Sequence, residues 1–285
     1  MSNLSLFTLT LLLCSLNQAA SEVYYIYTVK SDDLCTMQPC LTLSKFAANS
    51  SHYLHSNTTL VFLPGTHYLS KDNLILSNVY VDNFIMKSEN SKALIKCKSD
   101  SRMHFSCSQH IHITNLEFIG CGGNRVQDVE EFVVQDTMFK GEGGSRTALK
   151  LIGTAAQIVN STFVSNTMGS YRECAVLHNG YCIKGFVGGA IIATNSTTVT
   201  ISQSNFEDNG AEFGGAIFAD NRSTINLTDN VSFINNSAYL YGGVLLIIME
   251  AEKGNFVRFR NPQPASRKVN FYIILCECPA ITYGG

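Results

Sequence analysis

The stretch ISQSNFEDNGAEFGGAI, residues 201–217, decides the fold, because two short motifs within it recur along the chain. The first motif, FxxN, begins at Phe206, and the second, a glycine pair followed by Ala-Ile, begins at Gly214. The glycine motif recurs at intervals of 26 and 28 residues, and two independent markers that keep step at one period indicate a structural repeat. The further copies are Phe163-Val-Ser-Asn166, Phe233-Ile-Asn-Asn236, Gly188-Gly-Ala-Ile191 and Gly242-Gly-Val-Leu245.

Strand-like units that end in phenylalanine extend this repeat toward the N-terminus. One such unit is Ile113-Thr-Asn-Leu-Glu-Phe118, and another is Ile158-Val-Asn-Ser-Thr-Phe163. Because the longest interval between these phenylalanines contains Cys174 and Cys182, we interpret it as one coil that carries a looped insertion. The predicted repeat-core residues are Phe118, Phe139, Phe163, Phe206 and Phe233, spaced by 21, 24, 43 and 27 residues.

The repeat predicts strands rather than helices. Segments such as Thr198-Val-Thr-Ile-Ser202 alternate apolar and polar residues with a period of two, which is typical of half-buried strands. The repeat length suits one coil of short strands, and each coil can then hydrogen-bond to the next at about 4.8 Å. We therefore predict an all-β chain that forms a single-stranded right-handed parallel β-helix, in which each phenylalanine stacks on the one a coil away.

The asparagines of FxxN are expected to form a ladder at one turn of this helix. Asparagine tolerates a left-handed backbone, and stacked asparagine side chains bond to one another along the axis. The glycine pairs permit a tight corner, and the alanine that follows them fits a crowded interior. The predicted turn ladder is Asn166, Asn209 and Asn236.

The alternation of FxxN with GGA[IL] resembles the repeat of polymorphic outer-membrane proteins and of related pectin-lyase-like proteins with a right-handed β-helix. This resemblance covers about residues 113–245. The earlier segments Cys40-Leu-Thr-Leu and Leu60-Val-Phe-Leu-Pro-Gly65 look like the opening of metazoan β-helix surface proteins, notably sponge-type ones. The resemblance implies a search for the paired Asp residues, Gly-His-Gly triplet and Arg-x-Lys triplet of pectinase-like enzymes, and the sequence contains none of them in that form.

The two ends of the chain differ from the repeat. Residues 1–20 are typical of a secretory signal peptide, because the apolar run 6–14 is too short to span a bilayer and is followed by small residues. We expect residues 21–112 to form an N-terminal cap and the first coils, and residues 113–245 to form the repeat coils. Residues 246–285 are expected to be a divergent tail, so that the helix lacks a proper C-terminal cap and is a fragment of a longer one.

Ten cysteines and a series of N-x-S/T sequons indicate the oxidising secretory route. Short spacings suggest local loops closed by disulfides (Cys35…Cys40, Cys97…Cys107 and Cys174…Cys182), although spacing does not fix the connectivity. The disulfide candidates are Cys35, Cys40, Cys97, Cys107, Cys121, Cys174 and Cys182. The glycosylation candidates are Asn49, Asn57, Asn160, Asn195, Asn221, Asn226, Asn230 and Asn235. We therefore expect a secreted or cell-surface glycoprotein.

The acidic candidates for catalysis have a plain structural interpretation. Asp32 and Asp33 precede the helix, beside a cysteine. Glu207 and Asp208 lie in an FxxN turn, where neighbours on an extended chain point to opposite sides. Stacking would bring Asp208 near Asn235 on the next coil, and likewise Glu212 near Tyr239. General acid–base catalysis needs converging groups, so we interpret these positions as solvated turns and predict no catalytic residue.

The histidines suggest a metal site only weakly. His110 and His112 share one face of a predicted strand, and His104 and Cys107 are close by in sequence. Two histidines are insufficient for a tetrahedral site, and Cys107 is better used in a disulfide. We therefore predict neither a metal nor a cofactor.

These features favour a non-enzymatic adhesion, recognition or structural module, whose stacked faces bind an extracellular protein or glycan. The alternative is a polysaccharide lyase or glycoside hydrolase of the pectinase-like β-helix class. The net charge of −2 with scattered lysine and arginine argues against a nucleic-acid partner. No stretch after the signal peptide reaches membrane-spanning length, so we predict no membrane span there.

Overall fold

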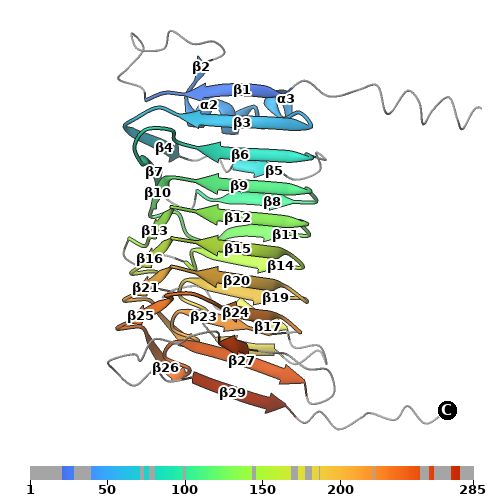
Figure 1. Cartoon of the computed structure of the whole chain (residues 1–285), viewed down its shortest axis with the longest axis vertical. Coiled ribbons are helices and arrows are strands. Elements are labelled where there is room, and N and C mark those ends of the chain that lie inside the picture. The colour runs from blue at the N-terminus through green and yellow to red at the C-terminus, as the bar shows by residue number, and fades with distance from the viewer. Residues whose placement is uncertain are drawn as a thin grey trace, which may run out of the picture.

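The computed structural model describes residues 21–28, 40–70, 74–76, 81–98, 101–142, 146–167, 173–176, 182–185, 187–220, 222–250, 257–259 and 271–276. Within these residues the chain winds into a column of stacked coils, which confirms the predicted parallel β-helix (Figure 1). The coils turn in the right-handed sense that connections between parallel strands of one sheet almost always take. Four predictions fall outside the described residues: the signal peptide 1–20, the acidic pair Asp32-Asp33, Cys35 and the sequon residue Asn221.

Three long parallel sheets form the walls of the column. Sheet 1 contains, in spatial order, β2 (Cys40–Leu41), β1 (Glu22–Ile26), β3 (Asn57–Phe62), β6 (Asn83–Lys87), β9 (His110–Thr114), β12 (Glu131–Gln135), β15 (Ala155–Val159), β20 (Thr198–Ser202), β24 (Thr224–Leu227) and β28 (Val257–Phe259). Sheet 2 contains β4 (Thr66–Ser70), β7 (Ala93–Lys98), β10 (Leu116–Ile119), β13 (Met138–Lys140), β16 (Thr162–Val164), β21 (Asn205–Glu207) and β25 (Ser232–Ile234). Sheet 3 contains β5 (Leu74–Leu76), β8 (Met103–Ser106), β11 (Asn124–Gln127), β14 (Leu149–Ile152), β19 (Ile191–Thr194), β23 (Ile217–Ala219), β27 (Leu245–Glu250) and β29 (Phe271–Cys276).

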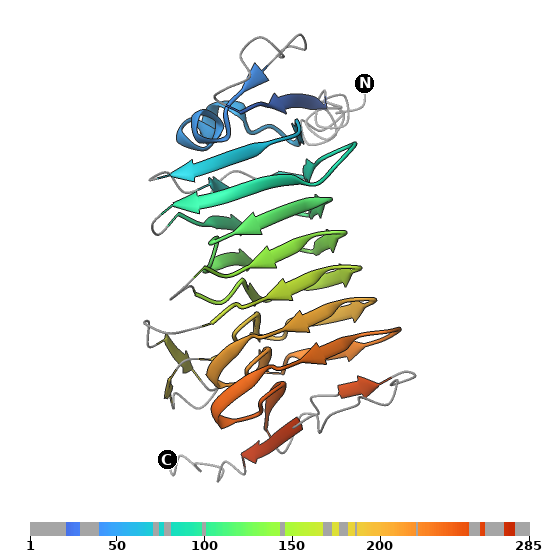
Figure 2. The ribbon, with the colours of Figure 1, turned by 90° about the vertical axis from the view of Figure 1, so that its left-hand side faces the viewer.

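Each coil contributes one strand to each sheet before the chain returns one level lower. For example, β9, β10 and β11 follow in sequence, and β12 then pairs in parallel with β9 (Figure 2). The register is one residue to one residue, so that Ile111 pairs with Phe132 and Ile113 pairs with Val134. Equivalent residues of successive coils therefore form columns along the axis.

Period-two alternation decides which columns face inward. In β9, Ile111 and Ile113 are fully buried, whereas His110, His112 and Thr114 are half-buried on the outer face. The same alternation recurs in the neighbouring strands, and their inward residues form one continuous apolar core. Burial of these columns is what holds successive coils together, because a single coil has no second layer to pack against.

The phenylalanines stack along sheet 2. Phe118, Phe139, Phe163, Phe206 and Phe233 are register partners in consecutive strands. Their ring centroids are 4.9, 5.2, 4.9 and 5.0 Å apart, and neighbouring rings are inclined by no more than 18°. These separations lie within the range of favourable aromatic pairs, so the stack adds ring contacts to the burial of apolar area.

A corner precedes each of these phenylalanines, which corrects the expectation of one continuous strand ending in Phe. The residue three positions before each Phe has a left-handed backbone, with φ between 47° and 57°. The strand of sheet 1 ends at this residue and the strand of sheet 2 begins after it, because the left-handed residue turns the chain. The five corner residues are Asn115, Asp136, Asn160, Gln203 and Asn230.

Asn166, Asn209 and Asn236 form a hydrogen-bonded ladder at the corner that follows the stack. The Asn166 backbone N–H and Nδ2 both donate to Asn209 Oδ1 at 3.0 Å, and Asn209 makes the same pair of bonds to Asn236 at 3.0 and 2.9 Å. The left-handed backbone that we expected at these asparagines lies one residue earlier, at Ser165, Asp208 and Asn235. The reason is that the asparagine side chains point inward to satisfy backbone groups, while the preceding residue makes the turn.

The glycine pairs divide two tasks between their members. The first glycine of each pair has a positive φ, which is 60° at Gly188 and 64° at Gly214. The second glycine packs against the backbone one coil below, since a Cβ at Gly189 would lie 2.2 Å from the carbonyl oxygen of Gly215. Any side chain at the second position would therefore separate two coils.

Two short helices cover the N-terminal end of the column. Helix α2 (Leu43–Ala48) begins at Thr42, whose side chain accepts a hydrogen bond from the Lys45 N–H, and α3 (Ser50–Tyr53) follows it. The Phe46 ring stacks on Tyr53 at 5.7 Å and meets Tyr24 of β1 edge-on. These contacts shield the first coils from solvent at that end.

Two departures from the regular coil lie in the C-terminal half. The long phenylalanine interval contains an antiparallel hairpin, β17 (Glu173–Val176) and β18 (Cys182–Gly185), between β16 and β19. A short parallel pair, β22 (Gly210–Phe213) and β26 (Ser237–Tyr241), widens two coils. In the tail, β28 pairs with β24 and β29 pairs with β27, so strand pairing continues after Leu245.

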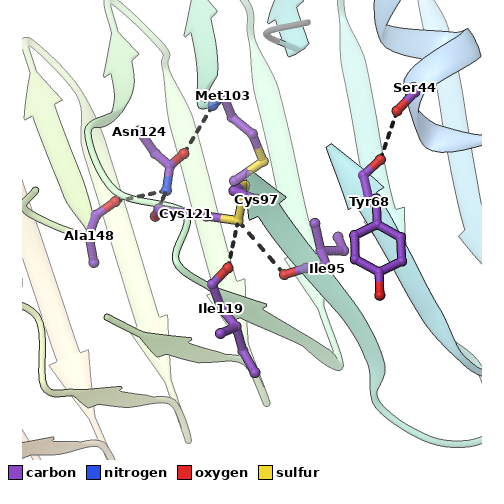
Figure 3. Close-up of a disulfide and its surroundings, with 9 residues drawn as sticks. All are labelled: Ser44, Tyr68, Ile95, Cys97, Met103, Ile119, Cys121, Asn124 and Ala148. Atoms are coloured by element: carbon purple, nitrogen blue, oxygen red, sulfur yellow. Dashed lines mark hydrogen bonds between the residues drawn. A yellow bond between two sulfur atoms is a disulfide. The ribbon is translucent and has the colours of Figure 1, made fainter. Parts of the chain in front are cut away.

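The disulfide of the described residues joins Cys97 to Cys121 (Figure 3). This corrects the expected pairing of Cys97 with Cys107, which is a free, exposed thiol. Cys97 and Cys121 lie one coil apart with their Cα atoms 4.9 Å apart, whereas Cys107 follows β8 at a different corner. Cys40 is disulfide-bonded, and Cys174 and Cys182 lie in the hairpin, opposite Lys184 and Val176.

Asn124 supports the neighbouring corner and was missed by the sequence analysis. Its Oδ1 accepts a hydrogen bond from the Met103 N–H at 3.0 Å, and its Nδ2 donates to the carbonyl oxygens of Cys121 and Ala148 at 2.8 and 2.9 Å (Figure 3). One buried side chain thus joins three successive coils.

Candidate functional site

A row of polar side chains runs along the outer face of sheet 1. Asn57, Asn83, His110 and Glu131 are register partners in β3, β6, β9 and β12, and Gln157 of β15 reaches toward the same row. We call these five residues the polar row. They share one face because each occupies an outward position of a strand that alternates with period two.

Hydrogen bonds link the members of the polar row along the helix axis. Asn83 Nδ2 donates to Asn57 Oδ1 at 2.7 Å, and His110 Nδ1 lies 3.1 Å from Glu131 Oε2. Gln157 Nε2 donates to Glu131 Oε1 at 3.2 Å. The side chains of His110 and Glu131 are 39% and 38% exposed, so their remaining hydrogen-bonding capacity faces solvent.

His112 places a second imidazole beside this row. Its Nε2 lies 3.9 Å from Glu131 Oε2, so one carboxylate stands next to two imidazoles. The outward positions on either side of His112 in its column are aliphatic, Ile85 and Val133. The face therefore combines planar hydrogen-bonding groups with apolar patches.

The structure separates the residues that the sequence suggested as a metal site. His110 and His112 share the outer face of sheet 1, as the spacing predicted. His104 lies on sheet 3, and Cys107 lies at the corner after β8. Within the part of the chain that the structure describes, no three residues of the His, Cys, Asp and Glu types come together as a metal site.

The acidic candidates lie in turns and at an edge. Asp208 is exposed, and its backbone N–H donates to the Ile234 carbonyl oxygen one coil below at 3.0 Å. Glu207 pairs in register with Ile234, and Glu212 lies in β22 beside β26. The described contacts bring no second carboxylate to Asp208, so these residues do not form an acid pair in the described structure.

The sequon asparagines lie mostly at corners and edges. Asn49, Asn160, Asn195, Asn230 and Asn235 are exposed, and Asn57 and Asn226 are half-buried on sheet 1. Asn160 Nδ2 donates to Asp136 Oδ1 at 2.5 Å, and Asn57 accepts the bond from Asn83. Asn57 and Asn226 lie toward opposite ends of the face that carries the polar row.

Sequence reasoning selected only one member of this row as a site residue, and for a different purpose. His110 was considered as a metal ligand, and Asn57 was considered only as a sequon. Asn83, Glu131 and Gln157 are 26 to 48 residues apart in sequence, and the interval between coils is not constant. Only the strand register shows that these residues are neighbours.

The sequence matches no protein-family profile, no curated protein and no solved structure. None of the helices in the described residues has the length and apolar character needed to cross a bilayer.

Proposed function

We propose that this chain is an extracellular recognition module without enzymatic activity, and that it binds a glycan along the outer face of sheet 1. The observation that carries the proposal is the polar row, in which amide, imidazole and carboxylate groups of successive coils are linked by hydrogen bonds. Planar groups of these types have donors and acceptors that suit sugar hydroxyls. The aliphatic residues beside the row suit the apolar faces of sugar rings.

The spacing of the row favours an extended ligand that lies parallel to the helix axis. Neighbouring strands of a sheet are about 4.8 Å apart, so the five strands from β3 to β15 extend over roughly 19 Å. A ligand of several sugar units would contact each member of the row in turn. Because the side chains are held by one another, their ordering on binding costs little entropy.

An extracellular location is part of the same proposal. The eight sequons, the Cys97–Cys121 disulfide and the apolar N-terminal run support a secretory route. Five of the sequon asparagines are exposed at corners and edges, where attached sugars would leave the centre of sheet 1 accessible.

The alternative is a pectinase-like lyase or hydrolase, and the His110–Glu131 pair is the observation that favours it. A carboxylate that orients an imidazole is a common acid–base arrangement. Cleavage of a glycan also needs a second acid, base or nucleophile across the bond, and the described face offers only His112 near that pair. Binding without turnover is therefore the preferred function.

Glycan-array binding of the secreted protein tests this proposal. We expect His110→Ala and Glu131→Gln to weaken binding about tenfold each, as the loss of a hydrogen bond from a charged group would. Thr224→Ala is the matched control, because Thr224 lies in the same outward column three strands beyond Glu131.

Two outcomes would overturn the proposal. Wild-type protein that binds no glycan but captures an extracellular protein would replace the ligand class. Release of reducing or unsaturated sugars by the wild type, abolished by Glu131→Gln, would establish the enzymatic alternative.

A further inference from the structure

A column of basic residues runs along the outer face of sheet 3, separate from the polar row. His104 of β8 pairs in register with Arg125 of β11, and Arg125 pairs with Lys150 of β14. We call these three residues the basic column. The three strands are neighbours, so basic side chains recur at about 4.8 Å along the axis.

The residues around the basic column add positive charge. Arg102 immediately precedes β8, and Arg146 lies just before β14. A Cβ placed on Gly123 would lie 3.0 Å from Arg146 Cδ, so the absence of a side chain there lets the arginine lie across the preceding coil. Five basic residues therefore gather within three successive coils.

The same face carries few acidic groups. The other outward positions of β8, β11 and β14 are Ser106, Gln127 and Ile152. Asp128 follows β11, where it accepts a hydrogen bond from Gln127 at 3.0 Å. Asp220, which acts electrostatically on Lys150, is buried two strands beyond it, and burial raises the pKa of this carboxyl to about 7. A neutral carboxyl offsets little of the positive potential.

The state of His104 shows that the positive charges act on one another. Burial lowers the pKa of this imidazole, and the charges of Arg125 and Arg102 lower it further. Arg125 is held in place by Gln127, whose Oε1 accepts hydrogen bonds from Arg125 Nε at 3.0 Å and from Nη2. The guanidinium is thus a fixed donor group in a positive field.

We propose that the basic column binds a sulfated glycan whose chain runs along the helix axis. A sulfate group presents several oxygens to the fork of donors on a guanidinium, and it remains ionised over the whole pH range in which proteins are folded. A sulfated chain carries its charges in a line, which matches a column better than it matches a compact site. This inference goes beyond the proposed function, because it concerns another sheet and a ligand of opposite charge character to a neutral glycan.

Other polyanions fit the face less well. A single-stranded nucleic acid would be expected to stack its bases on aromatic side chains, and the outward positions of β8, β11 and β14 contain none. With a net charge of −2, the chain has no overall attraction to anions, so any binding must come from a local feature.

Binding of dextran sulfate to the intact secreted protein tests the proposal, with uncharged dextran as the paired probe. We expect the wild type to bind dextran sulfate and not dextran. Arg125→Gln and Lys150→Gln should each weaken binding about tenfold, and raising the salt from 0.15 to 0.5 M should weaken it further. Lys140→Gln, an exposed lysine on sheet 2, is the matched control and should bind as the wild type does.

A second measurement does not depend on mutation. The pKa of His104, followed by the NMR titration of its ring protons, should rise when dextran sulfate is bound, because a nearby anion favours the imidazolium. Far-UV circular dichroism would confirm that each variant is folded.

Three results would overturn the inference. Equal losses in Lys140→Gln and Lys150→Gln would show diffuse charge attraction. Equal affinity for polygalacturonate or polyphosphate would remove the assignment to sulfate, and an unchanged pKa of His104 would place the ligand elsewhere. His110→Ala should not affect dextran sulfate binding, so failure here is distinguishable from failure of the proposed function.

Discussion

Replacing Phe163 with alanine should remove the centre of the phenylalanine stack. The ring is fully buried and lies between Phe139 at 5.2 Å and Phe206 at 4.9 Å. A buried Phe→Ala change costs about 3–5 kcal/mol through lost burial and the cavity that remains. Because two stacked contacts are lost with the ring, we expect a loss near the upper end, about 4–5 kcal/mol of unfolding free energy.

Phe233 provides the internal comparison. It is only partly buried, and Phe206 is its one neighbour within the described stack. Phe233→Ala should therefore cost roughly half as much, about 2 kcal/mol. Phe163→Leu keeps most of the side-chain volume and should cost about 1.5 kcal/mol.

Urea unfolding followed by far-UV circular dichroism, with the disulfides intact, measures these differences. Both the midpoint and the slope should be recorded, because a repeat protein weakened at its centre can lose two-state behaviour. If Phe163→Ala costs less than about 2 kcal/mol, or no more than Phe233→Ala, the stack does not stabilise the column as we have argued.

Three further perturbations follow from the same contacts. Asn209→Ala leaves the buried Asn166 N–H without its acceptor, and we expect a loss of about 2–3 kcal/mol in urea unfolding; a loss below 1 kcal/mol would contradict the ladder. Cys121→Ser opens the 24-residue loop that the bond to Cys97 closes, and it should cost about 3 kcal/mol, a difference that should vanish when both proteins are reduced. The raised pKa of Asp220, about 7 against 3.8, means that the folded state binds the extra proton between these values, so stability should be highest below about pH 4 and fall as pH rises to 7. Asp220→Asn should flatten that slope in thermal melts from pH 4 to 8, and an unchanged slope would show that the carboxyl is not responsible.

The repeat allowed the fold to be predicted, because its motifs mark positions that every coil must satisfy. Phenylalanine recurs where a large ring must stack, and the glycine pair recurs where two backbones come too close for a side chain. The position of the left-handed residues was wrong by one, since asparagine suits both a turn and an inward hydrogen bond. The corner residues three positions before each phenylalanine, such as Asn115 and Asp136, were a visible signal that we did not use.

The candidate sites could not be predicted, because they depend on register between coils of unequal length. His104 and Arg125 are 21 residues apart, and Arg125 and Lys150 are 25 apart, so no fixed period in the sequence aligns them. The disulfide failed for the same reason. Cys97 lies nearer to Cys107 along the chain, but Cys121 lies directly one coil below in space.

The asparagine ladder has a direction. Asn209 receives hydrogen bonds from Asn166 of the coil above, and its own Nδ2 donates back to the Phe163 carbonyl oxygen of that coil at 3.0 Å. Asn236 does the same for the coil of Asn209. Each newly added coil thus satisfies polar groups that its predecessor leaves open, which makes assembly vectorial. During synthesis from the N-terminus, every finished turn would serve as the template on which the next one closes.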